Sequence, residues 1–278
     1  MDFSVDTRQL DPAFSSLDGQ GFRWKRTLDI TLILLTLPLT IPLAILIALV
    51  IRAVSDGPIL FRQERVGYRG RRFMCFKFRT MFVDASADVH QGHLHQLMNS
   101  NKPMMKMDSK GDPRIIPFGV VLRASGLDEL PQLINVLRGD MSLVGPRPCL
   151  PYEYEKYLPW QKERFETLPG LTGLWQVSGK NRTTFVEMIQ LDIKYAKNKT
   201  VWWDLKIMLM TPPALLFQML ETRWLKKAAA AAKRQPKAGY SNRTASPYSF
   251  TKAPLVGAVH AAAQGDEAWV RKETKLNL

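Results

Sequence analysis

Two adjacent carboxylates, Asp128 and Glu129, have the types and the spacing that suit chemistry on a phosphate group. They lie at the start of a short apolar run typical of a helix, and the first turn of a helix favours ionised carboxylates and phosphates. Arg123 precedes the pair and Arg147 follows it. An aspartate at a helix start is, by itself, most often a cap worth about 1 kcal/mol. The two arginines and an upstream membrane segment favour the chemical interpretation over the cap.

The segment around the carboxylates predicts one helix that begins at Leu127 or the next residue and ends before Gly139. Pro131 is compatible with the first turn, where backbone donors lack an intrahelical partner, and glycine suits the position after a C-terminus. The i, i+3, i+4, i+7 spacing predicts one buried face, made of Leu130, Leu133, Ile134 and Leu137. Asp140 and Arg147 follow in a loop that two prolines make rigid.

The composition indicates a protein with a real core and an anionic partner. With 278 residues, of which 46% are hydrophobic, the chain can form one or two domains. Its net charge of +14 points to nucleic acid, an anionic membrane surface or phosphorylated substrates. The sequence contains no RNA- or DNA-binding motif, so we expect no nucleic acid partner. Cys75 and Cys149 fit neither a metal pattern nor a disulfide framework, which predicts unpaired thiols in a reducing compartment.

Residues 27–51 are the one segment that is apolar and long enough to cross a bilayer. Pro38 and Pro42 fall in its middle, where proline breaks or kinks a helix. Lys and Arg, which favour the cytoplasmic side, flank both ends. We therefore predict a broken helical hairpin that enters and leaves on one face. A single crossing and a buried soluble helix are the alternatives. Asp29 is expected to pair with Arg26 at the interface.

Residues 57–83 predict a small β-hairpin, because glycines separate two short runs of aromatic and apolar residues. Lys77 and Arg79 lie on its basic edge, which could face solvent, lipid headgroups or a diphosphate. Residues 168–185 predict tight glycine turns that carry Trp175, Gln176, Lys180 and Arg182. Such a stretch could hold a nucleotide, although a plain loop explains it equally well.

The C-terminal half of the chain reads as helical. Residues 184–198 predict a helix that buries Phe185, Met188, Ile189 and Asp192. Residues 201–225 predict short amphipathic helices that are broken at Pro212 and Pro213 and lie in the membrane interface, where tryptophan is favoured. An ordinary pair of core helices is the alternative.

Taken together, these motifs resemble the bacterial sugar transferase family. Its members are monotopic polyprenyl-phosphate phosphoglycosyl transferases that begin exopolysaccharide, O-antigen and glycan assembly. The matching stretches are KRTLD (25–29), FRQERVGYRG (61–70), FKFRTM (76–81), LRASGLDELPQLINVLRGDMSLVGPRP (122–148) and PGLTGLWQVSGKN (169–181), followed by LDIKYAKN and DLKIMLMT. They occur in order from Lys25 to Thr211, and we expect the minimal catalytic unit of the exopolysaccharide-initiating type. Two positions differ from the family pattern: Gly126 replaces a serine, and Ile41 replaces a small polar residue.

The resemblance implies transfer of sugar 1-phosphate from a UDP-sugar to undecaprenyl phosphate, with UMP as the second product. It also implies Mg²⁺ and a covalent phosphosugar intermediate on Asp128. By motif, Asp128 and Glu129 are the catalytic residues and the metal ligands. The expected substrate-binding residues are Arg123, Arg147, Lys77, Arg79, Asp140, Gln176 and Arg182. A ternary-complex transfer, with Asp128 as a metal ligand only, is the alternative mechanism, and a non-catalytic membrane-tethered binding protein is the alternative function.

The expected fold is α+β and predominantly helical, with a re-entrant membrane helix, a small β-hairpin and interface helices around a cytoplasmic catalytic core. The expected divisions are a flexible leader (1–22), the re-entrant helix (23–54), the catalytic domain (55–222) and a basic, partly disordered tail (223–278). The implied location is the cytoplasmic face of the bacterial inner membrane, in contact with anionic lipid. The sequence leaves a homodimer and the identity of the sugar open.

Overall fold

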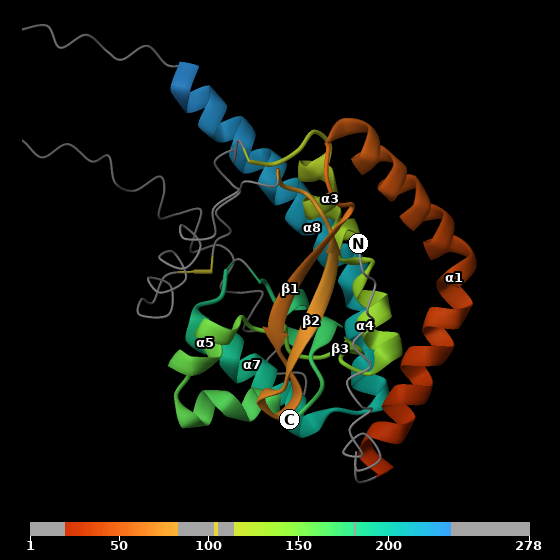
Figure 1. Cartoon of the computed structure of the whole chain (residues 1–278). Coiled ribbons are helices and arrows are strands. Elements are labelled where there is room, and N and C mark those ends of the chain that lie inside the picture. Colours follow the sequence, from red (N-terminus) through yellow and green to blue (C-terminus); the bar gives the residue numbers. More distant parts are fainter. Residues whose placement is uncertain (1–19, 83–102, 105–113, 181, 235–278) are drawn as a thin grey trace, which may run out of the picture. The chain divides into compact units, whose positions relative to one another are not determined.

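The computed structural model describes residues 20–82, 103–104, 114–180 and 182–234 (Figure 1). Most of the predicted leader and tail, residues 1–19 and 235–278, lies outside this part. The described chain is mostly helical and has two small two-stranded sheets, β1–β2 and β3–β4, which confirms the predicted α+β class.

Along the chain the elements follow in the order α1, β1, η2, β2, α3, η4, α4, β3, α5, η5, β4, α6, α7 and α8. The α-helices are α1 (Gln20–Val54), α3 (Gly119–Ser125), α4 (Gln132–Arg138), α5 (Pro151–Lys156), α6 (Leu174–Val177), α7 (Phe185–Asn198) and α8 (Val201–Arg234). The 3-10 helices are η2 (Tyr68–Gly70), η4 (Leu127–Glu129) and η5 (Pro159–Phe165). The strands are β1 (Leu60–Val66), β2 (Arg72–Phe78), β3 (Ser142–Val144) and β4 (Gly170–Thr172).

The predicted β-hairpin is confirmed. β1 and β2 pair antiparallel, with Leu60 opposite Phe78 and Val66 opposite Arg72. The connection between them turns at Arg69 (φ 51°) and Gly70 (φ 76°). Side chains alternate between the two faces of a strand, so the hairpin presents one set of residues to the body of the protein and another to its surface.

Helix α4 contacts β2 through the side chain of Asn135 as well as through apolar packing, in which Leu133 lies against a cluster that includes Cys75. The Asn135 side chain donates to the carbonyl oxygen of Met74 at 2.7 Å and accepts from the backbone N–H of Phe76 at 3.1 Å. The helix ends at Gly139 (φ 87°), as predicted. However, residues 127–129 form a separate 3-10 turn, and α4 begins only at Gln132.

The predicted buried face of this helix is right only in part, because Leu130 and Leu133 are partly buried and pack against the core. Ile134 and Leu137 are exposed, whereas Gln132, Asn135 and Val136 are buried. The reason is that the amide of Asn135 satisfies backbone groups of β2, and this contact sets the rotation of the helix about its axis.

Helix α1 is a single helix of 35 residues that stays helical through Pro38 and Pro42, although it is visibly bent (Figure 1). Two separate helices of a hairpin, as the sequence predicted, are not found. Within the described residues, α1 is the helix that is long and apolar enough to cross a membrane. Only 11% of its most apolar window is buried inside the protein. Leu35, Leu39 and Leu49 are among the exposed residues of that stretch.

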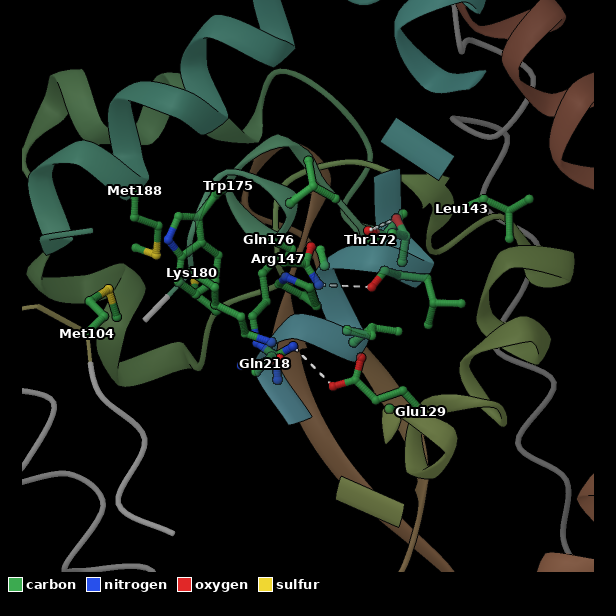
Figure 2. Close-up of a pocket in the computed structure, with 18 of the residues that line it drawn as sticks. Met104, Glu129, Leu143, Arg147, Thr172, Trp175, Gln176, Lys180, Met188 and Gln218 are labelled. Carbon is green, nitrogen blue, oxygen red and sulfur yellow. Dashed lines mark hydrogen bonds and ion pairs between the residues drawn. The ribbon is translucent and has the colours of Figure 1, made fainter. Parts of the chain in front are cut away.

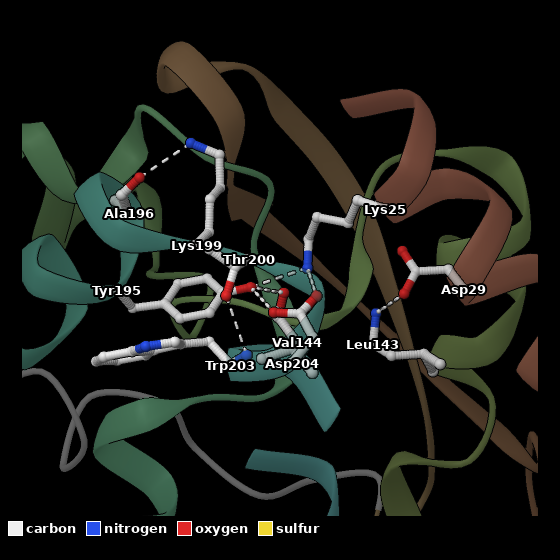
Figure 3. Close-up of polar contacts among 10 residues, drawn as sticks. All are labelled: Lys25, Asp29, Leu143, Val144, Tyr195, Ala196, Lys199, Thr200, Trp203 and Asp204. Atoms are coloured by element: carbon white, nitrogen blue, oxygen red, sulfur yellow. Dashed lines mark hydrogen bonds and ion pairs between the residues drawn. The ribbon is translucent and has the colours of Figure 1, made fainter. Parts of the chain in front are cut away.

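The N-terminal end of α1 is attached to the body by a buried charged network (Figure 3). The Lys25 ammonium lies 2.5 Å from Oδ2 of Asp204 and 2.9 Å from the Tyr195 hydroxyl. That hydroxyl lies 2.6 Å from Oδ1 of Asp204 and 3.1 Å from the carbonyl oxygen of Val144. Because Lys25, Tyr195 and Asp204 are fully buried, the network joins α1, α7, α8 and β3 in the interior.

The predicted pairing of Asp29 with Arg26 is wrong. Asp29 is buried and accepts the backbone N–H of Leu143 at 3.1 Å. Arg26 donates to the carbonyl oxygens of Val136 and Leu137 near the end of α4. The two side chains leave α1 toward different elements, so each satisfies backbone groups of the body instead of the other.

The C-terminal end of α1 is attached to the same body. Ile47 and Ile51 pack in a buried cluster with Phe78, Ile116 and Leu122. The segment after the helix is held by Arg79, which donates to Ser55 Oγ at 2.8 Å and to the Pro58 carbonyl oxygen at 2.6 Å. Both ends of α1 are thus fixed to one unit, while its apolar middle is exposed.

Helix α7 forms as predicted, and its buried residues include Phe185, Met188, Ile189 and Asp192. It begins with a capping box between Thr184 and Glu187. The prediction that Pro212 and Pro213 break the last helix is wrong, because α8 is continuous from Val201 to Arg234. The prolines remove two N–H donors, but packing of α8 against both α3 and α6 maintains the helix on either side.

Replacing Asp204 by asparagine is expected to destabilise the fold strongly. Asn keeps the size of the side chain but leaves the Lys25 ammonium buried without its ion-pair partner, and breaking a buried pair in this way typically costs about 3–5 kcal/mol. The exposed pair of Lys197 and Glu163, at 2.6 Å, is the matched control, because Glu163→Gln should cost at most about 1 kcal/mol. Thermal unfolding of both variants in the same detergent provides the measurement. Equal, small shifts in Tm would contradict a stabilising role for the network.

Candidate active site

A cavity of about 550 Å³ lies where the hairpin, η4, the loop after β3, α6 and α8 meet (Figure 2). The predicted residues that line it are Asp128, Glu129, Arg123, Arg147, Lys77 and Gln176. Residues that are up to about a hundred positions apart in the sequence are thus brought to one place. The two carboxylates and the two arginines that bracket them in the sequence thus line one cavity.

The two carboxylates project from the tight turn η4. Gly126 ends α3 with φ 74°, a conformation that glycine adopts without strain, and η4 follows directly. The Asp128 residue is only 8% exposed, yet it lines the cavity. The N-cap positions of η4 and α4 are Gly126 and Pro131, so the alternative that Asp128 is a helix cap is wrong.

Arg147 reaches the second carboxylate across the cavity. Its Nη1 donates to Oε1 of Glu129 at 3.1 Å, and the Glu129 carboxylate raises the pKa of the guanidinium. The backbone of this loop is restrained by Pro146 and Pro148, whose rings fix φ. The pair therefore holds Glu129 in place and keeps a fixed positive charge next to Asp128.

A buried arginine behind the cavity holds the backbone of this loop. Arg164 donates from Nη2 to the carbonyl oxygen of Arg147 at 2.9 Å and from Nη1 to the Tyr157 hydroxyl at 3.0 Å. Its charge is balanced by Asp192 of α7, at 2.5 Å, and both side chains are 2% exposed. The position of Arg147 is thus determined by a helix that lies some forty-five residues further along the chain.

Close backbone packing fixes the start of the same loop. β3 and β4 are parallel, with Ser142 opposite Gly170. A Cβ atom on Gly170 would lie 2.0 Å from the backbone nitrogen of Gly145, and one on Gly145 would lie 2.3 Å from the Leu168 carbonyl oxygen. Only glycine permits this approach, which explains Gly145 of the GPRP stretch and Gly170 of the PGLTG stretch.

Further cations surround the carboxylates. Arg123 donates to Thr80 Oγ1 at 3.3 Å, and Arg65 donates to the Pro148 carbonyl oxygen at 3.2 Å. Lys77 lines the same cavity, and burial, followed by repulsion from Arg65 and Arg123, lowers its pKa to about 8. Crowded, partly desolvated cations of this kind are stabilised by a bound anion, so the site suits phosphate groups.

Three predicted substrate-binding residues do not line the cavity. Arg79 uses its guanidinium to hold Ser55 and Pro58 after α1. Asp140 accepts from the Asn135 side chain at 3.2 Å, and Arg182 lies 5.1 Å from the ring centre of Phe217. Each of them therefore makes these contacts within the fold and outside this cavity.

The cavity is also lined by three charged residues that the sequence did not predict, Arg65, Glu153 and Arg164. In the hairpin, Phe61 lies opposite Lys77 and Arg65 lies opposite Phe73. Because side chains alternate along a strand, Arg65 and Lys77 share one face, and Arg65 could have been found from this alternation. Glu153, whose pKa is raised by burial, and Arg164 carry no comparable local signal.

The two carboxylates suit a divalent cation that takes only part of its ligands from the protein. Among the described residues, no group of three or more His, Cys, Asp and Glu side chains comes together. Mg²⁺, however, commonly uses one or two protein carboxylates and takes its other ligands from water and substrate phosphates. Asp128 and Glu129, side by side in a cationic cavity, match that pattern.

Comparison with known proteins places this geometry in a family. The chain is 45% identical over 193 residues to the galactosyl transferase CpsE of Streptococcus agalactiae, covering 69% of this chain and 42% of that protein. It is 40% identical over 198 residues to the undecaprenyl-phosphate galactose phosphotransferase of Salmonella typhimurium, covering 69% and 40%. It is 42% identical over 200 residues to the UDP-glucose:undecaprenyl-phosphate glucose-1-phosphate transferase of Caulobacter vibrioides, covering 69% of each.

The chain thus spans less than half of the length of the first two relatives. The sequence model of the bacterial sugar transferase family matches residues 20–218, a stretch that includes every residue of the cavity named above. This chain therefore belongs to the bacterial sugar transferase family.

Proposed function

We propose that this protein transfers sugar 1-phosphate from a UDP-sugar to undecaprenyl phosphate and releases UMP, at the cytoplasmic face of the bacterial inner membrane. The observation that carries the proposal is the ion pair of Arg147 and Glu129 beside Asp128, inside a cation-lined cavity. Family membership and an exposed apolar helix support it. The printed names of two relatives mention galactose and glucose, and we leave the hexose open.

The reaction consists of two displacements at one phosphorus atom. A carboxylate oxygen of Asp128 attacks the β-phosphorus of the UDP-sugar, the bond from that phosphorus to the bridging oxygen breaks, and UMP leaves with the electron pair. A phosphate oxygen of the lipid then attacks the same phosphorus and releases the Asp128 carboxylate, forming the lipid diphosphate sugar. Covalent catalysis lets a soluble product leave before the lipid enters.

The protein's main task is to offset the repulsion between an attacking carboxylate and a diphosphate. Arg123, Arg147, Arg65 and Lys77 would hold the phosphate oxygens and neutralise their charge. Asp128 and Glu129 would also hold Mg²⁺, which supplies further charge neutralisation and orients the diphosphate when bound. The alternative is a ternary complex in which Asp128 binds the metal only and the lipid phosphate attacks directly.

For the membrane helix we propose a re-entrant arrangement in which both ends of α1 stay on one face. Its N-terminal end is fixed by Lys25 and its C-terminal end by the contacts of Ile51 and Arg79, all with the same body. A straight helix of 35 residues would measure about 52 Å, and its ends could not then both approach that body without a bend. The exposed Trp202 and the basic surface support contact with anionic lipid headgroups.

The covalent route predicts a labelled protein when lipid is absent. Wild-type protein incubated with Mg²⁺ and a UDP-sugar labelled in the sugar should acquire the label, and Asp128→Asn should acquire none. Asp140→Asn is the matched control, because Asp140 lies outside the cavity, and it should be labelled like the wild type. Transfer to lipid without any adduct or exchange of UMP would instead support the ternary complex.

Arg147→Lys is expected to lower kcat/KM by about ten- to a hundredfold, because hydrogen bonds to charged groups contribute about 1.5–3 kcal/mol and lysine cannot reproduce the guanidinium geometry. Arg182→Lys, outside the cavity, should change kcat/KM less than about twofold. Initial rates of UMP release give the measurement. Similar losses in the two variants would argue against a specific role for the ion pair with Glu129.

The topology is tested with single cysteines at exposed positions on either side of the apolar stretch, Arg23→Cys and Asp56→Cys. An impermeant maleimide should label both in inverted inner-membrane vesicles and neither in intact spheroplasts. Leu39→Cys, in the exposed middle of α1, should be protected in both preparations. Labelling of one position from each side would show a single crossing.

A further inference from the structure

One side of the cavity is aliphatic rather than charged. We call this side the α8 wall, and its residues present a hydrocarbon surface to the cavity. It comprises Leu130, Leu143, Leu171, Met208, Pro212, Ala214 and Leu215. Figure 2 shows Leu143 and Thr172 on the side of the cavity away from Met104 and Met188. The cavity therefore has a side chemically different from its cationic centre.

Contacts between these elements show that the wall is one surface. Leu143 and Met208 pack against the same buried cluster of Val144, Tyr195 and Ile207. The Thr172 hydroxyl lies 2.9 Å from that of Thr211, which joins β4 to the middle of α8. β3, β4 and α8 thus share one apolar boundary.

The α8 wall contains few groups that could recognise a polar ligand. The Thr211 hydroxyl donates to the Ile207 carbonyl oxygen at 2.7 Å, so Thr172 and Thr211 use their donors within the protein. Pro212 contributes a ring and no N–H. A nucleoside or a sugar, whose polar edges need partners, is poorly matched by such a surface, whereas a hydrocarbon chain is well matched.

The wall begins next to the nucleophile. A Cβ atom on Gly126 would lie 3.7 Å from Cδ2 of Leu215, so the backbone two residues before Asp128 faces the leucine. A chain lying on Leu215 can therefore end in a phosphate among the cations that surround Asp128.

The wall also continues to the outside of the protein. Beyond Leu215, α8 exposes Leu216, Phe217 and Leu220. Helix α3, which packs against α8, exposes Phe118, Val120 and Val121. Exposed apolar residues concentrated on two packed helices indicate a surface that meets lipid rather than water.

We propose that the prenyl chain of the acceptor lipid phosphate lies on the α8 wall while its phosphate reaches Asp128. This proposal rests on the proposed function and deepens it by assigning one side of the cavity to the lipid. Two observations select this occupant: α8 carries aliphatic residues that line the cavity and exposed apolar residues directly after them, and the same cavity holds a group of cations that complements a phosphate. The sugar nucleotide is left with the opposite side, near Trp175 and Lys180.

The test compares Leu215→Gln, in the wall, with Leu209→Gln on the same helix. Leu209 is 76% exposed and does not line the cavity, so the two variants lose the same hydrophobicity at different places. Acceptors are geranyl, farnesyl and undecaprenyl phosphate in the same detergent. In the wild type and in Leu209→Gln, kcat/KM should rise with prenyl length. In Leu215→Gln it should fall at least tenfold with undecaprenyl phosphate and little with geranyl phosphate, so that the dependence on length flattens.

A second measurement distinguishes a loss of lipid binding on the α8 wall from a general loss of folding or of UDP-sugar binding. Binding of the UDP-sugar without acceptor, measured by calorimetry with Asp128→Asn added to each protein so that no adduct forms, should be the same in all three. Ala214→Phe fills the space beside the α8 wall instead of making the wall polar, and it should reproduce the selective loss of kcat/KM with undecaprenyl phosphate. Equal Tm values establish that each variant is folded. The proposal would be overturned if kcat/KM depended on prenyl length in both wall variants as it does in the wild type, or if the variants lost UDP-sugar binding to the same extent. Failure of the wild type with every lipid phosphate would overturn the proposed function instead.

Discussion

The buried contact of Lys25 with Asp204 and Tyr195 is the constraint on which the arrangement of the other elements depends. A charged pair taken out of water is tolerated only when its geometry and its remaining hydrogen bonds are satisfied, so it fixes its elements more narrowly than apolar packing does. Here it fixes the start of the apolar helix α1 relative to α8, and through Val144 it fixes the end of β3. The apolar helix α1 and the loop that carries Arg147 therefore share one support.

A second buried pair, Arg164 with Asp192, performs the same task on the other side of that loop. The loop is thus held by a carbonyl contact from Arg164, by close glycine packing against β4 and by two proline rings. Such support places the guanidinium of Arg147 against Glu129 with little freedom. Preorganised charge costs no rearrangement during a reaction, which is the main requirement for chemistry on a diphosphate.

The sequence predicted what depends on local pattern. Strand alternation and glycine spacing gave the hairpin, helical periodicity gave α7, and two adjacent carboxylates between arginines gave the centre of the site. The differences depend on distant partners: Asn135 rotates α4 because its amide meets β2 some sixty residues earlier, and Arg79 donates to Ser55 and Pro58, outside the cavity. Neither the partner of a polar side chain nor the continuity of a helix through two prolines can be deduced from periodicity alone.

The continuity of α8 has a consequence for how two unlike substrates meet at one carboxylate. A helix broken at Pro212 would present free backbone groups at the cavity, whereas the intact helix presents proline, alanine and leucine side chains there. One side of the cavity is thereby apolar, and the other carries cations and an aromatic ring. Under the proposed function, a water-soluble donor and a lipid acceptor would approach the same carboxylate, Asp128, from these different sides, which is the spatial requirement of a two-step transfer between water and membrane.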